Sequence, residues 1–402
     1  MDTCRSEDRL IAFDEACCKV PERLLIAHGR GHVLFITGAG SSKSSGLPDF
    51  RELTLEVYKR LDNAVHIALT AIPRGVCNQW QVPVGTLRPD QLAEVRRFIQ
   101  GDYDVALGML ERRIDKASTP TTKVRNAVSS ILREGGNKPA EIHRSLIRLA
   151  SRGSVATIIT TNFDLLLELA AKSQRKEMEC YSLSSIPRPG RSDEFRGVLH
   201  IHGALERDPA RAGYCIITDQ DFGEFYLRRQ VVPEFIYEAA RLFRIVLVGY
   251  SANDPPMRYL LNAVAADGNR FDDLQERFAF VGATGDPDPV QLEDWRARGI
   301  TPIAYDSANE HAQLAHTLGK WASYSAVNGK PEIVERTIEK IARKSRDAVS
   351  EIERDLFEHL YRRGSNSERH RYMKVVARVQ PEMEWLDALL NIDREPRSQA
   401  VP

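Results

Sequence analysis

One stretch near the start of the chain limits what the protein can fold into more than any other. Residues 32–36 form a largely apolar run that leads into a turn with glycines at positions 38 and 40. Such a run predicts a buried strand of a parallel sheet, and glycine allows a ligand to approach the backbone closely. Ser41 and Ser42 are suited to cap a following helix, whose free N–H groups can face an anion. The stretch therefore predicts the strand–turn–helix geometry that holds a dinucleotide pyrophosphate.

The glycine spacing alone does not identify a nucleotide site. A GxGxxG pattern beginning at Gly38 would need a third glycine at position 43, where this chain has Lys43. A tight strand–helix loop without a ligand is therefore an alternative interpretation. The more specific signal lies in the second half of the stretch, which reads Gly46-Leu47-Pro48-Asp49-Phe50-Arg51.

Length and charge exclude some broad classes of protein. The chain has 402 residues, enough for two or three domains at about 150 residues each. Lysine plus arginine equals aspartate plus glutamate at 56 each, so the formal net charge is zero. Nucleic-acid binders usually carry a basic excess, so we expect no sequence-specific nucleic-acid binding. A net charge near zero also gives little repulsion against self-association.

The cysteines and the N-terminal residues indicate a reducing compartment. The six cysteines stand at positions 4, 17, 18, 77, 180 and 215, and no pair has the CxxC spacing of a zinc site. We therefore expect no zinc, and we interpret Cys17 and Cys18 as core residues. Early charged residues argue against a signal peptide, and no run reaches the roughly 18 apolar residues of a membrane span. The expected location is the cytoplasm, without membrane attachment.

Apolar runs alternate with helical patterns through most of the chain, which predicts an α/β fold with a doubly wound (Rossmann-like) parallel sheet. A helix is expected over residues 7–29, split or kinked at Pro21. A helical insertion is expected over about 52–140, between the first and second strands. The expected strands are 32–36, 155–161, 198–203, 214–218, 245–249, 278–281 and 300–304.

The strand patterns end near residue 325. Apolar residues spaced by three and four then predict one long amphipathic helix over 334–360, whose narrow seam suits a helix partner. A second helix is expected over 373–389, continuing past Pro381. The sequence thus divides into an N-terminal helix (1–30), an α/β domain (31–324) and a helical C-terminal region (325–402) for oligomerisation or partner binding.

Polar residues follow three further strands of the predicted sheet, where α/β folds place their chemistry. Asn162 and Asp164 follow the second strand, His202-Gly203 ends the next, and Gly249-Tyr250-Ser251 leads to Asn253-Asp254. Each group has a plainer interpretation. Asn162 and Asp164 can form a cap and turn that open a helix. His202 can be a packed strand-end histidine, and Ser251 and Asn253 can be helix N-caps.

Taken in order, these four blocks resemble the sirtuin (silent-information-regulator) family of NAD-consuming enzymes. The first block is nearly the family pattern GAGxSxxSGIPDFR, and the resemblance covers roughly residues 31–310 without the helical insertion. It implies that residues 31–324 are an NAD-binding catalytic domain. Family deacylases carry a four-cysteine zinc module between the His-Gly strand and the next nucleotide-binding strand. Here that interval holds only Cys215 among the cysteines.

The missing module makes the pattern more similar to bacterial sirtuin-like proteins of antiphage defence, many of which destroy NAD. That branch often works as large assemblies or beside a partner ATPase. The resemblance therefore implies a homo-oligomer and a HerA-type ATPase or helicase partner, with NAD as the substrate.

The resemblance also assigns roles to individual residues. Asn162 would hydrogen-bond to the ribose hydroxyls or to the attacking water. His202 would be the general base, with an unshifted pKa near the working pH. His200, on the same sheet face, is interpreted as a packing residue. Asp49 and Arg51 can alternatively be a surface ion pair. The implied cofactor-binding residues are Gly38, Ala39, Gly40 and Ser41 (pyrophosphate), Asp49, Phe50 and Arg51 (a loop over the ribose and phosphate), Asp164 (carboxamide), Gly249, and Ser251 and Asn253 (adenosine half).

Three functions are compatible with these motifs. The favoured one is an NAD glycohydrolase that yields ADP-ribose and nicotinamide as a defence effector. The alternatives are a protein deacylase or ADP-ribosyltransferase, and a nucleotide-sensing subunit of an ATPase complex.

Overall fold

The structure is a computed structural model. It describes residues 9–72, 87–115, 122–135, 138–152, 155–176, 178–183, 185–190, 194–205, 215–249, 261 and 274–395. None of the helices in these ranges is both long and apolar enough to cross a lipid bilayer.

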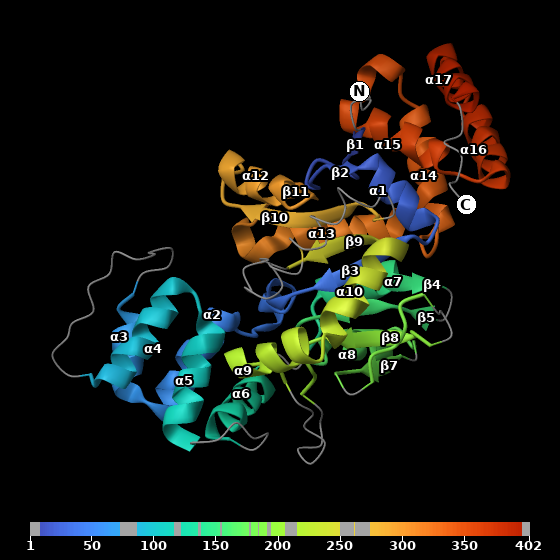
Figure 1. Cartoon of the computed structure of the whole chain (residues 1–402). Helices are drawn as coiled ribbons and strands as arrows, with labels where there is room; N and C mark the ends of the chain where they lie inside the picture. The colour runs from blue at the N-terminus through green and yellow to red at the C-terminus, as the bar shows by residue number, and fades with distance from the viewer. Residues whose placement is uncertain are drawn as a thin grey trace, which may run out of the picture.

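A parallel sheet forms the centre of the molecule (Figure 1). Seven described strands lie in the order β11-β10-β9-β3-β6-β8-β7, and each neighbouring pair is parallel. The predicted α/β fold with a doubly wound sheet is therefore confirmed. The strands are β3 (Val33–Thr37), β6 (Ile158–Thr160), β7 (Glu179–Tyr181), β8 (Gly197–His200), β9 (Arg244–Val248), β10 (Arg277–Ala283) and β11 (Ile300–Asp306).

Helices cover both faces of this sheet, which explains why its strands read as continuous apolar runs. Alternate residues of β3 point to opposite faces. Val33 and Phe35 join one core, and Leu34 and Ile36 join the other. The first face is covered by α1 (Glu22–Gly29), α7 (Glu141–Ala150), α8 (Leu166–Ser173) and α13 (Ala308–Tyr324), and the second by α10 (Val231–Leu242) and α12 (Pro289–Ala297).

The predicted helical insertion is confirmed and has an apolar core of its own. It lies to one side of the sheet (Figure 1). Arg125 ties it to the α/β part by pairing with Glu111 of the insertion at 3.0 Å and with Asp221 at 2.8 Å. The helices are α2 (Phe50–Leu61), α3 (Asn63–Thr70), α4 (Pro89–Gln100), α5 (Tyr103–Asp115) and α6 (Lys123–Glu134).

The strand expected over 214–218 is wrong for its described part. Residues 215–217 alternate as predicted, but Cys215 and Ile217 face the insertion core while Ile216 faces the sheet core. The alternation therefore reflects two cores and not a strand pairing. A short helix, α9 (Asp219–Phe222), and a π-helical turn, η4 (Gly223–Arg228), follow.

The helix expected over 7–29 forms only in the last third of that range. Residues 10–11 and 20–21 form an antiparallel strand pair, β1 (Leu10–Ile11) with β2 (Val20–Pro21), and α1 begins at Glu22. Pro21 directly precedes the helix because proline suits its start and not its interior. The strand expected over 155–161 is likewise split. β5 (Val155–Ala156) pairs with β4 (Ser151–Arg152), and β6 begins after Thr157.

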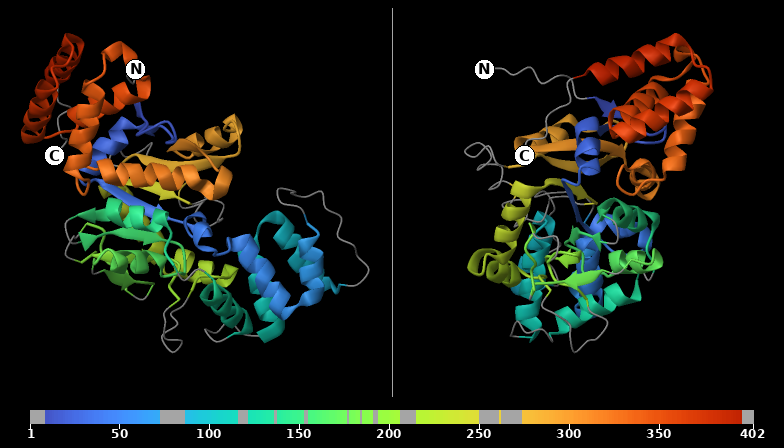
Figure 2. Two further views of the ribbon diagram at one scale, coloured as in Figure 1. Left: turned by 180° about the vertical axis from the view of Figure 1, so that it is seen from behind. Right: turned by 90° about the vertical axis from the view of Figure 1, so that its right-hand side faces the viewer.

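The single long helix expected over 334–360 is two helices. α14 (Pro331–Ala342) ends before a short 3₁₀ turn, and Ser350 caps α15 (Glu351–Arg362) by accepting from the Glu353 N–H at 3.2 Å. The second helix expected over 373–389 is also two helices, α16 (Asn366–Arg378) and α17 (Met383–Arg394), because the chain breaks around Pro381. The apolar seam includes Val334, Ile338 and Leu356. It lies in the same core as α1 and residues 11–20, shown in blue beside the orange and red helices (Figure 2). The seam predicted for a helix partner is thus buried within this chain.

Candidate active site

The predicted site motifs meet at one edge of the sheet. β9, β3, β6 and β8 are neighbours, and their carboxyl ends lead into Gly249, Gly38, Asn162 and His202 respectively. From β3 the chain order runs through β6 and β8 on one side, then crosses to β9 on the other. Such a switch point opens the crevice in which α/β sheets bind ligands.

The glycine turn differs from its prediction in one respect. Ser41 and Ser42 do not cap a helix, because the chain forms two 3₁₀ turns, Ala39–Ser41 and Lys43–Ser45, before α2 begins at Phe50. The Ser41 and Ser42 N–H groups donate to the carbonyls of Gly38 and Ala39 at 2.9 and 3.0 Å. The turn itself satisfies these N–H groups in this state.

Glycine is required where the turns after β3 and β9 touch. The Gly40 N–H donates to the Gly249 carbonyl at 2.8 Å. Gly249 has φ +61°, and a Cβ on it would lie 2.3 Å from the Ser41 nitrogen. A Cβ on Gly40 would lie 2.9 Å from the Gly249 oxygen. Two predicted cofactor-binding motifs are thus in direct backbone contact.

Asn162 reaches across to the glycine turn. Its side-chain amide donates to the Gly38 carbonyl at 3.1 Å and to the Ser42 hydroxyl at 3.0 Å, with the Ser41 hydroxyl at 3.3 Å. The motif after β6 is therefore joined to the motif after β3, although they are more than 120 residues apart in sequence. A simple cap-and-turn role does not account for these contacts.

Asp164 completes the same network. The Ser42 hydroxyl donates to one of its carboxylate oxygens at 2.8 Å, and the other accepts from the Leu166 N–H at 3.0 Å, at the start of α8. Burial raises the pKa of Asp164, and these two hydrogen bonds oppose the shift. The aspartate thus forms a turn with the first N–H of α8, directly before its N-cap residue Leu165, while its second oxygen faces the site.

His202 lies beside Asn162 but has a different partner. Backbone hydrogen bonds join the segment of His202 to that of Asn162. The Ile201 N–H donates to the Thr160 carbonyl at 3.0 Å, and the Leu205 N–H donates to the Phe163 carbonyl at 2.8 Å. The His202 Nε2 atom is hydrogen-bonded to the Tyr226 hydroxyl at 2.8 Å.

The expected unshifted pKa of His202 is wrong for this state. Only 4% of the residue is exposed, and burial lowers its pKa to about 3. The imidazole is therefore neutral at neutral pH. Sequence reasoning missed Tyr226, because it approaches from the π-helical turn η4, which no local pattern links to the strand.

His200 is also more than a packing residue. It is fully buried, its Nδ1 lies 2.8 Å from the Asn162 carbonyl oxygen, and its Nε2 lies 2.7 Å from the Glu168 carboxylate. Burial opposes a charge on this ring, but the neighbouring Glu168 carboxylate outweighs burial and holds the pKa of His200 well above its usual value. The position of His200 next to the His-Gly motif is evident in the sequence, but its contact with Glu168 is not.

Phe50 and Arg51 face the helical insertion, whereas Asp49 has local partners. Asp49 caps α2 in a reciprocal pair with Glu52 and lies 2.8 Å from Lys43, a partner other than the predicted Arg51. The Phe50 ring packs edge-on against Tyr103. The Arg51 guanidinium donates to the Ile72 carbonyl at 3.0 Å and lies over the Phe98 ring. A contact between Phe50 or Arg51 and a ribose therefore requires this segment to rearrange.

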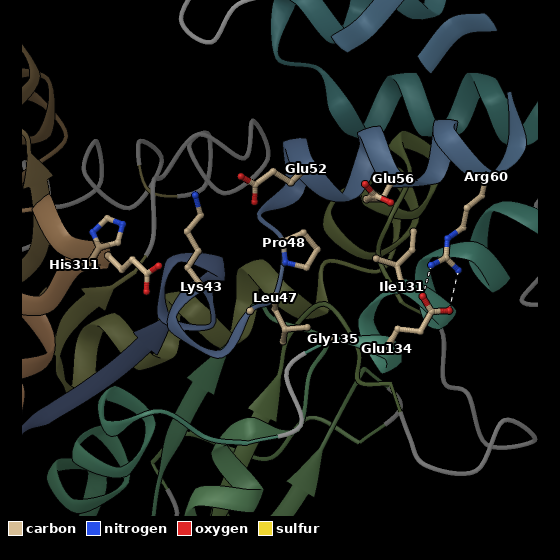
Figure 3. A pocket seen from close by; sticks show the side chains of 12 residues that line it. Lys43, Leu47, Pro48, Glu52, Glu56, Arg60, Ile131, Glu134, Gly135 and His311 are labelled. Atoms are coloured by element: carbon tan, nitrogen blue, oxygen red, sulfur yellow. Dashed lines mark hydrogen bonds and ion pairs between the residues drawn. The ribbon is translucent and has the colours of Figure 1, made fainter. Parts of the chain in front are cut away.

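A pocket of about 590 Å³ opens beside the 3₁₀ turns. Lys43, Leu47 and Pro48 form one wall, α2 a second, and the end of α6 a third (Figure 3). Most of its charged groups already have partners, such as Arg60 with Glu134. The pocket shows that the outer surface of the segment from Lys43 to Pro48 is open.

Ser251 and Asn253 lie outside the described residues, so their predicted contacts with adenosine are untested.

Comparison with known proteins agrees with this fold and with the motifs that follow β6, β8 and β9. Residues 156–303 match the SIR2-like domain family, a range that includes Asn162, His202 and Gly249 but not the glycine turn at 38–51. The chain is also 33% identical over 294 residues to an uncharacterized protein, y4cA, of Sinorhizobium fredii (strain NBRC 101917 / NGR234). That alignment covers 71% of this chain and 22% of the relative, so the chain spans about a fifth of the relative's length. The match and the site geometry together make residues 156–303 similar to SIR2-like domains.

Proposed function

We propose that this protein is an NAD glycohydrolase, which cleaves the nicotinamide–ribose bond of NAD to give ADP-ribose and nicotinamide. One observation carries the proposal, namely the network that joins the Asn162 amide to Gly38 and Ser42 at the switch point of the sheet. It puts a hydrogen-bonding side chain against the turn suited to a pyrophosphate, beside a buried histidine. The match to a SIR2-like domain supports the same class of chemistry.

The residues at the strand ends suit this reaction. The leaving nicotinamide is already cationic, so no strong acid is needed to expel it, and the ribose develops an oxocarbenium-like centre. The protein must hold the ribose, position a water molecule and accept a proton. The Asn162 amide can exchange its hydrogen bond with Ser42 for one to a ribose hydroxyl or to that water. Asp164 can accept a hydrogen bond from the nicotinamide carboxamide.

The low pKa of His202 places a condition on its role as a base. An imidazole buried beside Tyr226 gains a positive charge only if a nearby negative charge compensates it. The pyrophosphate of bound NAD is a source of such a charge. We infer that His202 acts as the base when the bound pyrophosphate supplies this negative charge.

Several finer parts of the proposal rest on the family resemblance. They are a role in antiphage defence through NAD depletion, assembly into homo-oligomers, and work beside a HerA-type ATPase or helicase. The apolar seam of α14 and α15 is buried in the chain's own core, so an assembly surface has to lie elsewhere.

A nucleotide-sensing role is a second candidate, favoured by the internally satisfied Asn162 and the low pKa of His202. A site of this kind can bind NAD tightly and turn it over slowly. A deacylase or ADP-ribosyltransferase activity is the third alternative, and it predicts a product that depends on an acyl-lysine or protein acceptor.

One assay separates the three. The purified full chain is incubated with NAD, with and without an acylated peptide, and the released nicotinamide and ADP-ribose are quantified by chromatography. We expect acceptor-independent release of both products, abolished in His202→Ala and unchanged in His370→Ala, a control at an exposed histidine of α16. Tight NAD binding without release would favour the sensor, and release that requires the peptide would favour the deacylase.

A further inference from the structure

Three potential metal ligands of different types meet next to Asn162. They are the His200 Nε2 atom, the Glu168 carboxylate and the Cys180 thiol, and their ligand atoms all lie within 4.8 Å of one another. They come from β8, α8 and β7, which lie together in the fold (Figure 1). Neither the family resemblance nor the proposed mechanism assigns Glu168 or Cys180 a role.

The sheet register explains why these side chains meet. Cys180 on β7 is paired with Val198 on β8, and His200 lies two residues further along β8. Since side chains alternate along a strand, Cys180 and His200 face the same side of the sheet. Leu167 and Ala170 of α8 pack in the same core as Val198, so α8 covers that side and brings Glu168 to the pair.

Three features suit coordination once zinc displaces the proton that lies between His200 Nε2 and Glu168. The His200 Nδ1 atom lies 2.8 Å from the Asn162 carbonyl, as the second ring nitrogen of a metal-bound histidine commonly does, and this leaves Nε2 directed at the cluster. The second carboxylate oxygen of Glu168 is buried without a hydrogen-bond partner in the described structure. Cys180 forms no disulfide and its thiol already contacts both His200 and Glu168, and because the residue is exposed, solvent reaches the cluster from β7.

We propose that His200, Glu168 and Cys180 form a binding site for zinc, with a fourth position open to water. Nitrogen, sulfur and carboxylate ligands are the set that zinc prefers, and tetrahedral coordination places neighbouring ligands about 3.4–3.6 Å apart. His200 Nε2 and Glu168 Oε1, now 2.7 Å apart, need to separate by about 0.7 Å, within reach of a glutamate side-chain rotation. This proposal departs from the sequence-based expectation of no zinc, which rested on cysteine spacing and the missing four-cysteine module and not on a mixed donor set of this kind.

The site would influence the neighbouring catalytic motif. Because His200 holds the Asn162 carbonyl, zinc on Nε2 fixes the ring and with it the backbone position of Asn162. This coupling rests on the proposed function, whereas zinc binding does not. A protein that binds zinc but does not hydrolyse NAD would therefore support the metal site and refute the proposed function. A protein that hydrolyses NAD but binds no zinc would do the opposite.

A second cluster in the chain provides an internal control. Asp14, Cys17 and His316 also lie within coordination range, but Lys320 Nζ lies 2.9 Å from the Asp14 carboxylate and already supplies a positive charge there. Cys17 is buried, unlike Cys180. We therefore expect zinc at the Cys180 cluster only.

The test uses the full chain, freed of metal with a chelator. Zinc affinity is measured by competition with a chromophoric chelator, and cobalt(II) is added separately to detect thiolate ligation by its near-ultraviolet charge-transfer absorption. We expect one equivalent of zinc per chain and a cobalt–thiolate band. In Cys180→Ser the band disappears and zinc affinity falls by more than about tenfold, a loss at least as large as that for a residue that only orients a metal ligand. Glu168→Gln weakens zinc similarly.

The control variant His316→Gln should retain both the band and the affinity. Cys180 is exposed, so its serine variant should fold, and circular dichroism checks that it does. The proposal is overturned if the wild type binds no zinc at micromolar concentration, if Cys180→Ser binds it as tightly as the wild type, or if His316→Gln loses it.

Discussion

Replacing Gly249 with alanine should damage the contact between the two turns at the switch point. Gly249 has φ +61°, and an alanine there carries about 1–2 kcal/mol of backbone strain. Its Cβ would also lie 2.3 Å from the Ser41 nitrogen, so the glycine turn must move. Overpacking of this kind costs about 1–3 kcal/mol. We expect the free energy of unfolding to fall by about 2–5 kcal/mol in total.

Gly285 offers a matched control in the same α/β part. Its φ is +81°, and a Cβ there would meet nothing within 4 Å. The free energy of unfolding of Gly285→Ala should therefore fall only by the cost of backbone strain, about 1–2 kcal/mol. Urea denaturation of both variants measures the difference, provided that their m-values agree.

The displaced turn should also affect ligand binding. Ser41 lies within hydrogen-bond distance of Asn162, so Gly249→Ala should weaken NAD binding by at least about tenfold, or about 1.4 kcal/mol, in a calorimetric titration, while Gly285→Ala leaves it unchanged. Equal losses of stability in the two variants, together with equal affinities, would refute the claimed contact between the turns.

Two further predictions concern buried charges. Burial favours the neutral form of Glu22, but His359 and Arg362 at 3.0 and 2.9 Å outweigh it and lower its pKa to about 2 from an ordinary 4.5. This depressed pKa stabilises the folded state by about 3 kcal/mol above pH 4.5, and the contribution is lost as the pH falls toward 2. Glu22→Gln should therefore be destabilised at pH 7, and its deficit relative to wild type should shrink in urea melts at about pH 3; a deficit independent of pH would contradict this. Arg125→Met leaves Glu111 buried without its cation and should cost about 3–5 kcal/mol in urea melts. Removing the exposed Arg97, which pairs with Asp102, should cost no more than about 1 kcal/mol, and equal costs would contradict the assignment.

The sequence predicts the central strands of the sheet for a physical reason, but not the short edge strand β7. Strands buried on both faces read as unbroken apolar runs, so β3, β9, β10 and β11 are evident from their residues alone. Residues that follow such strands share one edge by topology, which is why the sequence alone places Asn162 near the glycine turn.

The wrong predictions fall where tertiary contacts override local pattern. Residues 215–217 alternate like a strand because they lie between two cores, and the run at 334–360 keeps its helical spacing across a break at 343–350. Periodicity reports which side of a segment is buried and not what buries it.

Long-range polar contacts have no signal in the sequence. Tyr226 reaches His202 from a π-helical turn, and Glu168 reaches His200 from α8, so neither pair has a fixed spacing that a motif could show. The predicted pKa of His202 is wrong for the same reason, because its burial depends on Phe222 and Tyr226, which pack around it.

The most direct test of the proposed chemistry is NAD turnover by an Asn162→Ala variant. The control is Asn391→Ala, at an exposed asparagine of α17 in the C-terminal helical region. We predict that the wild type and Asn391→Ala release nicotinamide and ADP-ribose in equal amounts, and that Asn162→Ala remains folded but releases neither. Nicotinamide release by Asn162→Ala at the wild-type rate would contradict the assignment of this site.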